Sequence, residues 1–355
     1  MEHPARSENN FDFLRFLAAM MVVVSHSFWL YERSNPLAVA GGQFGIGPIA
    51  VYMFFVISGF LITASWQNSQ QVFAFFAKRL LRILPALTVV TLLTVLVVGP
   101  LATDLPLGRY YSDSQTWGYL SNLFFWVQYR LPGVFAANPF PHTVNGSIWT
   151  LPFVILMDLS LVGLALSGLL RRSTVLVGAL ALMLLNIGLL TLLDVDSRGL
   201  VNLIRLGAYF YAGVALYLLF DKVPRSGVLA LALAVVLAVG IGAGAGGVAA
   251  MLTLPYLVVY LAFARIPRLA RFGRHGDFSF GIYLFGFPLQ QLLIHWLGTE
   301  QLSLYGFIAL SMTASLAMGV LSFHLVERPA LRLRRYLPSR PFAGAMQATV
   351  TRLTR

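Results

Sequence analysis

The chain of 355 residues contains no cysteine, which excludes disulfide bonds, thiol nucleophiles and cysteine metal ligands. Charged residues are also scarce, at 11% of the sequence against the roughly 25% typical of soluble domains. Acidic residues are the scarcest, since 13 Asp and Glu stand against 25 Lys and Arg, and the formal net charge is +12. A catalytic nucleophile or base must therefore come from another residue type.

Long apolar segments occupy most of the chain, which is 58% hydrophobic with a mean hydropathy of +0.78. Runs near the roughly 20 residues that cross a bilayer recur along nearly its whole length. The first run lacks a small-residue cleavage site, so we expect a retained helix and not a signal peptide. We predict an all-α polytopic membrane protein with about ten transmembrane helices. Their expected positions are near residues 11–30, 49–66, 83–101, 149–170, 174–193, 201–220, 227–242, 248–264, 278–297 and 303–325.

The distribution of basic residues predicts that both termini are cytoplasmic. If the N-terminus lies inside, the cytoplasmic side receives all but five of the 25 basic residues. The five exceptions are Arg33, Arg109, Arg130, Arg198 and Arg205. Because the basic residues alternate between connections and form no single stripe, the lipid bilayer is the expected partner and nucleic acid is excluded. We expect one transmembrane domain over residues 1–330 and a basic cytoplasmic tail over 331–355.

Two ionisable residues inside the first predicted span are candidates for chemistry, because charged groups are costly in a bilayer and usually functional there. Arg15 and His26 are eleven positions apart, so both leave the same helix face about 16 Å apart in depth. His26, in the outer half, could deprotonate an acceptor hydroxyl or be acylated itself. The structural alternative is a histidine bonded across a helix interface, with Arg15 reaching lipid head groups.

A basic cluster of Lys78, Arg79 and Arg82 stands at the cytoplasmic start of the third predicted span. Arg79 and Arg82, three residues apart on a helix, could together bind phosphates with their forked donors. Anchoring of the positive cytoplasmic side explains the same residues without any ligand. Two residues at the end of the last span, His324 and Glu327, are expected to cap and anchor that helix and not to catalyse.

Asp158 lies near the middle of the fourth predicted span and needs a partner, because an isolated carboxylate is costly there. Arg205, in the sixth span, is the expected structural partner. His26 is the functional alternative, since a carboxylate can orient an imidazole. We keep both possibilities open. No histidine has a spacing that indicates metal ligation, so no metal site is expected.

The longest connection, about residues 102–147, is expected outside the cytoplasm and is rich in aromatic residues. These rings could form an interfacial belt at the membrane surface or a platform on which sugars stack. They are Tyr110, Tyr111, Trp117, Tyr119, Phe124, Phe125, Trp126 and Tyr129.

Several segments resemble the membrane-bound acyltransferase family 3, whose bacterial members O-acylate cell-envelope and exported carbohydrates. The opening helix FDFLRFLAAMMVVVSHSFW carries the family's arginine and histidine at Arg15 and His26. The segments VYMFFVISGFLIT and FAKRLLRILPAL, the latter with Arg79 and Arg82, follow in the family's order. Further along, the matching segments are NGSIWTLP, DFSFGIYLFGFPLQQ and HLVERPALRLRR.

The resemblance implies an acyltransferase that transfers groups other than amino-acyl groups, in a bacterial cytoplasmic (inner) membrane. It implies acyl-CoA as the donor substrate, acetyl-CoA in the first instance, and no permanently bound cofactor. The implied acceptor is a hydroxyl of a cell-envelope or exported carbohydrate or glycolipid. The implied roles are a catalytic His26 with Arg15 as its companion, and donor-phosphate binding by Arg79 and Arg82.

Two positions of the fourth predicted span depart from the family's pattern. Where the family commonly has a glutamate, followed four residues later by a tyrosine, this chain has Val154 and Asp158. Both lie on one helix face, so Asp158 could replace the acid from about one turn, or about 6 Å, away. A shift of that size can spoil catalytic geometry. Two alternatives therefore stay open, a catalytically silent relative and a transporter or flippase that uses the same polar path.

Overall fold

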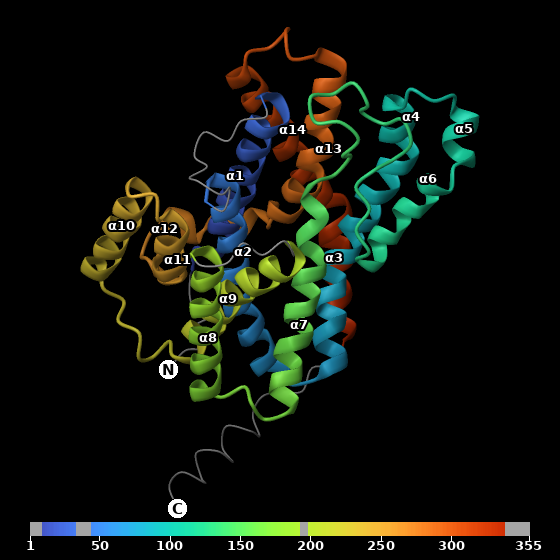
Figure 1. Cartoon of the computed structure of the whole chain (residues 1–355). Coiled ribbons are helices and arrows are strands. Elements are labelled where there is room, and N and C mark those ends of the chain that lie inside the picture. The colour runs from blue at the N-terminus through green and yellow to red at the C-terminus, as the bar shows by residue number, and fades with distance from the viewer. Residues whose placement is uncertain (1–8, 33–43, 192–197, 338–355) are drawn as a thin grey trace, which may run out of the picture.

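The protein is represented by a computed structural model that describes residues 9–32, 44–191 and 198–337. These residues form an all-helical bundle without any β-strand, which confirms the predicted class (Figure 1). The described part of the chain contains eight helical segments long and apolar enough to cross a membrane. Arg33 and the predicted tail beyond residue 337 lie outside the described residues.

Five of the eight long segments are single helices, and the other three join helices that follow one another without a break. They are α1 (Phe11–Glu32), α2 (Ile46–Ser69), α3 (Val72–Leu93) with η2 (Thr94–Val98) and α4 (Gly99–Ala102), η4 (Ser147–Thr150) with α7 (Leu151–Leu166), α9 (Arg198–Leu218), α11 (Gly246–Phe263), α13 (Ser279–Leu297), and α14 (Leu304–Ser322) with η6 (Phe323–Glu327), α15 (Arg328–Arg332) and η7 (Leu333–Tyr336).

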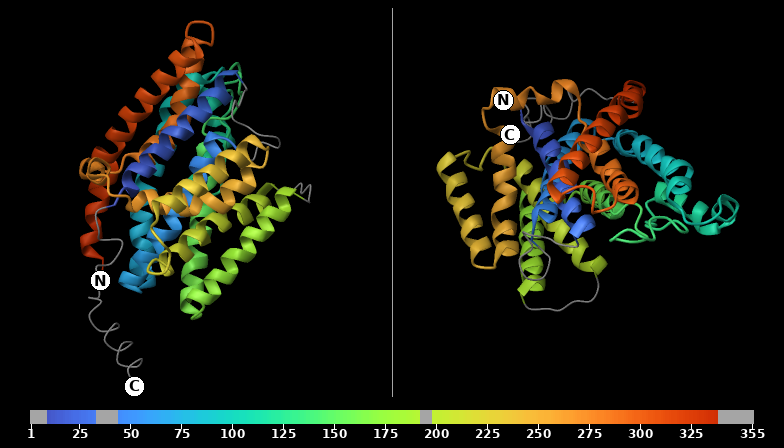
Figure 2. Two further views of the ribbon diagram at one scale, coloured as in Figure 1. Left: turned by 90° about the vertical axis from the view of Figure 1, so that its left-hand side faces the viewer. Right: turned by 90° about the horizontal axis from the view of Figure 1, so that it is seen from above.

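Two further apolar helices, α8 (Arg172–Thr191) and α10 (Gly227–Gly242), flank the bundle, and each of the ten predicted segments falls on a helix. Seen from above, α10 and α11 lie on one flank, and α5 (Leu107–Ser112) and α6 (Ser114–Gly118) lie on the opposite flank (Figure 2). The remaining short helices are η3 (Tyr119–Phe124), α12 (Pro267–Ala270) and η5 (Phe272–His275).

Helix α2 crosses the centre of the bundle and packs closely against α9. A Cβ atom on Gly59 would overlap the carbonyl oxygen of Phe210, and one on Gly213 would overlap that of Val56. Small residues allow this approach of two backbones, which is how helices in a membrane gain packing energy where apolar burial gives little. The pair Gly59 and Gly213 therefore fixes the distance between α2 and α9.

The predicted start of the third span at residue 83 is wrong, because α3 begins at Val72. An apolar window excludes Arg79 and Arg82, but both side chains lie on the helix and pair with carboxylates inside the protein. Pairing reduces the cost of a buried charge, so the helix extends through the basic residues. The basic cluster is thus part of the bundle and not of a preceding loop.

Two π-helical segments interrupt the long helices, and in each case a proline follows one residue after the segment ends. The segment η2 precedes Pro100, and η6 precedes Pro329. Proline cannot donate the backbone hydrogen bond that would continue an α-helix, so the hydrogen-bond register changes ahead of it. In η6 this change accompanies the burial of Glu327 inside the bundle.

The connection between α4 and η4 (Figure 1) packs around a small apolar core that it shares with η2, α4 and α13. Tyr110 and Tyr119 are buried in it, and the Tyr110 hydroxyl donates to the Val95 carbonyl oxygen at 2.9 Å. These two rings are therefore core residues, and neither a belt nor a platform describes them. Phe124 and Trp126 are 82% and 72% exposed, so they keep both predicted roles open.

Candidate active site

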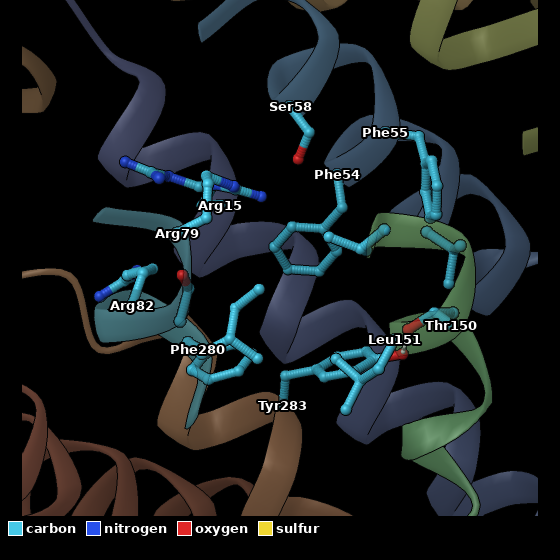
Figure 3. Close-up of a pocket in the computed structure, with 14 residues that line it drawn as sticks. Arg15, Phe54, Phe55, Ser58, Arg79, Arg82, Thr150, Leu151, Phe280 and Tyr283 are labelled. Atoms are coloured by element: carbon cyan, nitrogen blue, oxygen red, sulfur yellow. Dashed lines mark hydrogen bonds between the residues drawn. The ribbon is translucent and has the colours of Figure 1, made fainter. Parts of the chain in front are cut away.

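A cavity of about 130 Å³ opens between α1, α2, α3, α7 and α13, and we call it the arginine cavity. Its polar side is formed by Arg15 of α1 and by Arg79 and Arg82 of α3. The opposite side carries the Thr150 hydroxyl and the Tyr283 ring, with aromatic and aliphatic side chains between the two sides (Figure 3). The three basic residues singled out in the sequence thus come together in one place.

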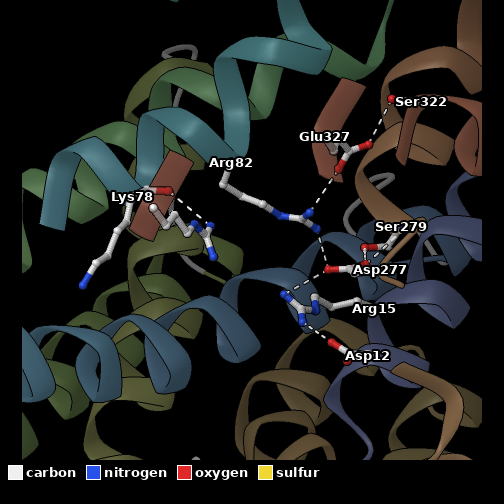
Figure 4. A network of polar contacts seen from close by, with 9 residues as sticks. Asp12, Arg15, Lys78, Arg82, Asp277, Ser279, Ser322 and Glu327 are labelled. Carbon is white, nitrogen blue, oxygen red and sulfur yellow. Dashed lines mark hydrogen bonds and ion pairs between the residues drawn. The ribbon is translucent and has the colours of Figure 1, made fainter. Parts of the chain in front are cut away.

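The arginines of this cavity are held by an ion-pair network that joins four elements (Figure 4). Asp277, just before α13, pairs with Arg15 at 3.3 Å and also with Arg82. Arg82 pairs in addition with Glu327 of η6 at 3.0 Å, and Arg15 pairs with Asp12 one turn earlier in α1. Because α1 and η6 share this network, the two ends of the described helical domain lie at the same end of the bundle.

Asp277 stays ionised because of its neighbours. Burial alone would raise the pKa of its carboxyl group, but the Arg15 and Arg82 guanidiniums and hydrogen bonds from Ser279 lower that pKa from 3.8 to about 2. The Ser279 backbone N–H donates to the same carboxylate at 3.2 Å. Asp277 is therefore a fixed negative charge between two arginines at neutral pH.

Asp158 pairs with neither of its predicted partners. Its Oδ2 atom accepts a hydrogen bond from Arg79 Nε at 2.7 Å, and its side chain is completely buried. Arg205 and His26 belong to a different cavity, described below, whereas Arg79 lies on the neighbouring face of α3. Sequence reasoning missed this pair because Arg79, at the cytoplasmic start of the third span, was considered only for phosphate binding or for anchoring at the membrane surface. Asp158 lines neither cavity, whereas Val154, one turn earlier, lines the arginine cavity.

A second cavity of about 300 Å³, the histidine cavity, lies between α1, α2, α9 and the segment around Trp149. His26 of α1 lines it, together with Arg205, Asn202 and Tyr52. The His26 ring packs edge-on against Phe287 with the ring centroids 5.0 Å apart. Within the described part of the chain, no side chain or backbone group forms a hydrogen bond with this imidazole. Its ring nitrogens therefore remain available to a ligand in the cavity.

The two cavities meet at Val51 and Tyr283, which line both. The Tyr283 hydroxyl donates to the Ser147 carbonyl oxygen at 2.7 Å and shares a hydrogen bond with the Thr150 hydroxyl at 2.7 Å. These bonds fix the ring that forms the boundary. Arg15 and His26, on one face of α1, thus reach the two cavities from opposite sides of this boundary.

Sequence reasoning missed the carboxylates that hold the arginines. Glu327 was expected to cap the last span, but it is buried, pairs with Arg82 and accepts a hydrogen bond from Ser322 at 3.0 Å. Asp12 and Asp277 were not weighed at all. Both lie in the segments that resemble the acyltransferase family, so a search of those segments for ionisable residues would have found them.

The fold and the cavities define a multi-pass membrane protein whose helices enclose adjoining arginine-lined and histidine-lined cavities. The chain belongs to the membrane-bound acyltransferase family 3, whose profile, described as an acyltransferase domain, matches residues 8–323. It is therefore an acyltransferase, as the sequence resemblance predicted.

Two characterised relatives support this assignment. The chain is 30% identical over 330 residues to an O-acetyl transferase of Shigella phage Sf6, and the alignment covers 90% of this chain and 95% of that protein. It is also 30% identical over 381 aligned positions to Nodulation protein 10 of Rhizobium leguminosarum bv. viciae, with coverage of 97% and 99%. No solved structure matches the chain significantly.

Proposed function

We propose that the protein transfers an acyl group, in the first instance acetyl, from cytoplasmic acyl-CoA to a hydroxyl of a cell-envelope or exported carbohydrate or glycolipid. The observation that carries this proposal is the junction of the two cavities at Val51 and Tyr283, with arginines on one side and His26 on the other. The relative named O-acetyl transferase favours acetyl as the group and oxygen as its acceptor.

The arginine cavity is the proposed donor site. A guanidinium carries five N–H donors. Arg79 pairs with one carboxylate and Arg82 with two, so both side chains can hold their ion pairs and still donate to phosphate oxygens. The ion pairs also fix the guanidinium planes before the donor arrives, which lowers the entropic cost of binding. With Lys78 and the arginines of α15 and η7 at the same end, the donor enters from the cytoplasm of a bacterial inner membrane.

The histidine cavity is the proposed acceptor site. His26 accepts the proton of the acceptor hydroxyl while that oxygen attacks the thioester carbonyl carbon of the donor. The carbon–sulfur bond then breaks, and the coenzyme A sulfur leaves with the proton that His26 returns. The result is an ester on the acceptor and free coenzyme A. A neutral imidazole without a competing hydrogen bond is suited to begin this step.

The proposal is tested by measuring free coenzyme A released by purified protein supplied with acetyl-CoA and a panel of envelope glycans. We expect release from the wild type and a loss of at least about 100-fold in His26→Ala, the scale of general-base catalysis. His275→Ala is the matched control, because His275 is exposed and lines neither cavity. Equal release from wild type and His26→Ala, with donor binding intact, would contradict the proposal.

A further inference from the structure

The charge of the histidine cavity is set by one residue. Among the side chains that line it, Arg205 of α9 is the one that carries a permanent charge, and no carboxylate of the described residues lines it. The other polar lining groups are Ser25, His26, Asn202 and hydroxyls of tyrosines. A ligand in this cavity therefore meets a net positive surface.

Arg205 differs from the arginines of the neighbouring cavity in its partners. Arg15, Arg79 and Arg82 each pair with an aspartate. Arg205 Nε donates to the neutral Asn186 Oδ1 at 3.4 Å, and its guanidinium also hydrogen-bonds the Tyr52 hydroxyl. Within the described part of the chain no carboxylate lies within ion-pair distance of it. Its positive charge is thus uncompensated where the structure is described.

An arginine without a countercharge in a membrane span needs a reason, because inserting an ionised side chain into a bilayer is costly. Such residues generally face a cavity and mark a substrate path. A guanidinium fork matches the two oxygens of a carboxylate or phosphate and gives no comparable gain with a neutral hydroxyl. A carboxylate or phosphate of a ligand in this cavity would therefore supply the countercharge that the described residues do not.

The neighbouring lining residues suit a sugar that bears this oxyanion. Asn202 lies three residues before Arg205 on the same face of α9, so its amide can hydrogen-bond hydroxyls beside the anionic group. The Trp149 ring lines the same cavity and offers a flat apolar surface. His26 lines it as well, so a sugar held by Arg205 presents a neighbouring hydroxyl to the imidazole.

We propose that the acceptor is an anionic carbohydrate, carrying a carboxylate or phosphate near the acylated hydroxyl, and that Arg205 selects it. This inference rests on the proposed function, in which the histidine cavity receives the acceptor. Arg205 is a specificity-determining residue in this scheme and takes no part in bond formation. A purely structural arginine, bonded to Asn186 and Tyr52, would give no such selection.

The test compares acceptors that differ only in charge. Purified full-length protein is given acetyl-CoA and methyl glycosides of glucuronic, galacturonic or mannuronic acid, their neutral hexose counterparts, or the corresponding hexose 6-phosphates. We expect kcat/KM at least about 10-fold higher for an anionic sugar than for its neutral counterpart, as one charge-assisted contact provides. A preference for the uronic acids identifies a carboxylate, and a preference for the phosphates identifies a phosphate.

Variants assign the preference to Arg205. Arg205→Gln should raise KM for the anionic acceptor about 10-fold to 100-fold and leave KM for acetyl-CoA unchanged, while Arg205→Lys should retain part of the preference. Arg268→Gln, a change of an exposed arginine in α12, is the matched control. If Arg205→Gln does not fold, two wild-type measurements still test the proposal. A preference for anionic acceptors and competitive inhibition by free glucuronate would support an anion site in the histidine cavity, and the absence of both would contradict it.

The possible failures are distinguishable. Wild-type transfer that depends on His26 but is equal for neutral and anionic sugars overturns the inference about Arg205 and leaves the proposed function standing. An equal loss for both kinds of acceptor in Arg205→Gln assigns the residue a structural role and also overturns the inference. No coenzyme A release with any acceptor, and no difference between wild type and His26→Ala, overturns both proposals.

Discussion

At the scale of single residues, the most informative contact is the ion pair between Arg79 and Asp158. Both residues could be identified from the sequence as costly charges, but their partnership could not, because it depends on how α3 packs beside α7. Sequence spacing orders side chains along one helix and says nothing of the neighbouring helix. The same limit explains why the pairing of Arg82 with Asp277 and Glu327 emerged only from the structure.

Breaking the pair by removing one partner should be costly. We expect Asp158→Ala to lower the free energy of unfolding by about 3 kcal/mol, because it leaves the Arg79 guanidinium without its countercharge. Arg79→Gln combined with Asp158→Asn should cost less than the sum of the two single changes. Denaturation in detergent of the wild type, Arg79→Gln, Asp158→Asn and the double variant measures this coupling, and Asp158→Ala is measured beside them. Strictly additive losses in the double variant would show that the pair does not interact.

The Asp277 pair should be insensitive to pH in the physiological range. Because the pKa of its carboxyl group is lowered from 3.8 to about 2, its contribution to stability is present above about pH 4 and is lost as pH falls through about 2. In a Glu327→Gln background, which removes the other carboxylate that pairs with Arg82, Asp277→Asn should therefore lower the melting temperature by the same amount at every pH from about 5 to 8. A difference that shrinks toward pH 5 would mean that the carboxyl group titrates near neutrality.

At the scale of elements, each of the ten predicted apolar segments falls on a helix, and eight helical segments in the described part of the chain are long and apolar enough to cross a membrane. A bilayer imposes a minimum apolar length that composition reveals directly. The start of α3 was missed because hydropathy treats every arginine as exposed. The close approach of α2 to α9 was also not predictable, since a glycine in a predicted span does not by itself indicate that another helix packs against it. The role of Gly59 and Gly213 in packing is visible only when the backbone of the opposite helix is in place.

We expect Gly59→Leu to separate α2 from α9 and to lower the stability by about 3 kcal/mol, since a large side chain would be forced into the Phe210 backbone. Gly163→Leu in α7 is the matched control, because no atom lies within 4 Å of a Cβ built there. Thermal unfolding of both variants tests the packing. Equal melting temperatures would contradict the close contact of α2 and α9.

At the scale of the whole molecule, the bundle encloses two cavities that share Val51 and Tyr283 as lining residues. The ion-pair network brings the start of α1 and the end of η6 together, as an even number of crossings requires. The predicted orientation places this end in the cytoplasm. The absence of native cysteine makes that prediction simple to test, because any introduced cysteine is the only thiol.

A cysteine at Lys78, near the arginine cavity, should react with a membrane-impermeant maleimide only after the cytoplasmic face is made accessible. A cysteine at Phe124, exposed in the connection between α4 and η4, should react in intact cells. Labelling of both variants in whole cells and in inverted vesicles gives the orientation. The reverse pattern would place the arginine cavity outside.

The central claim, that donor and acceptor reach one reaction centre from opposite sides, is tested most directly in proteoliposomes of uniform orientation. Labelled acetyl-CoA is supplied on one side of the membrane and the acceptor carbohydrate on the other. We predict labelled acceptor only when acetyl-CoA faces the Arg79 end, with the signal lost in His26→Ala. Labelled acceptor formed when acetyl-CoA is present only on the opposite side, or formed equally by His26→Ala, would contradict the account.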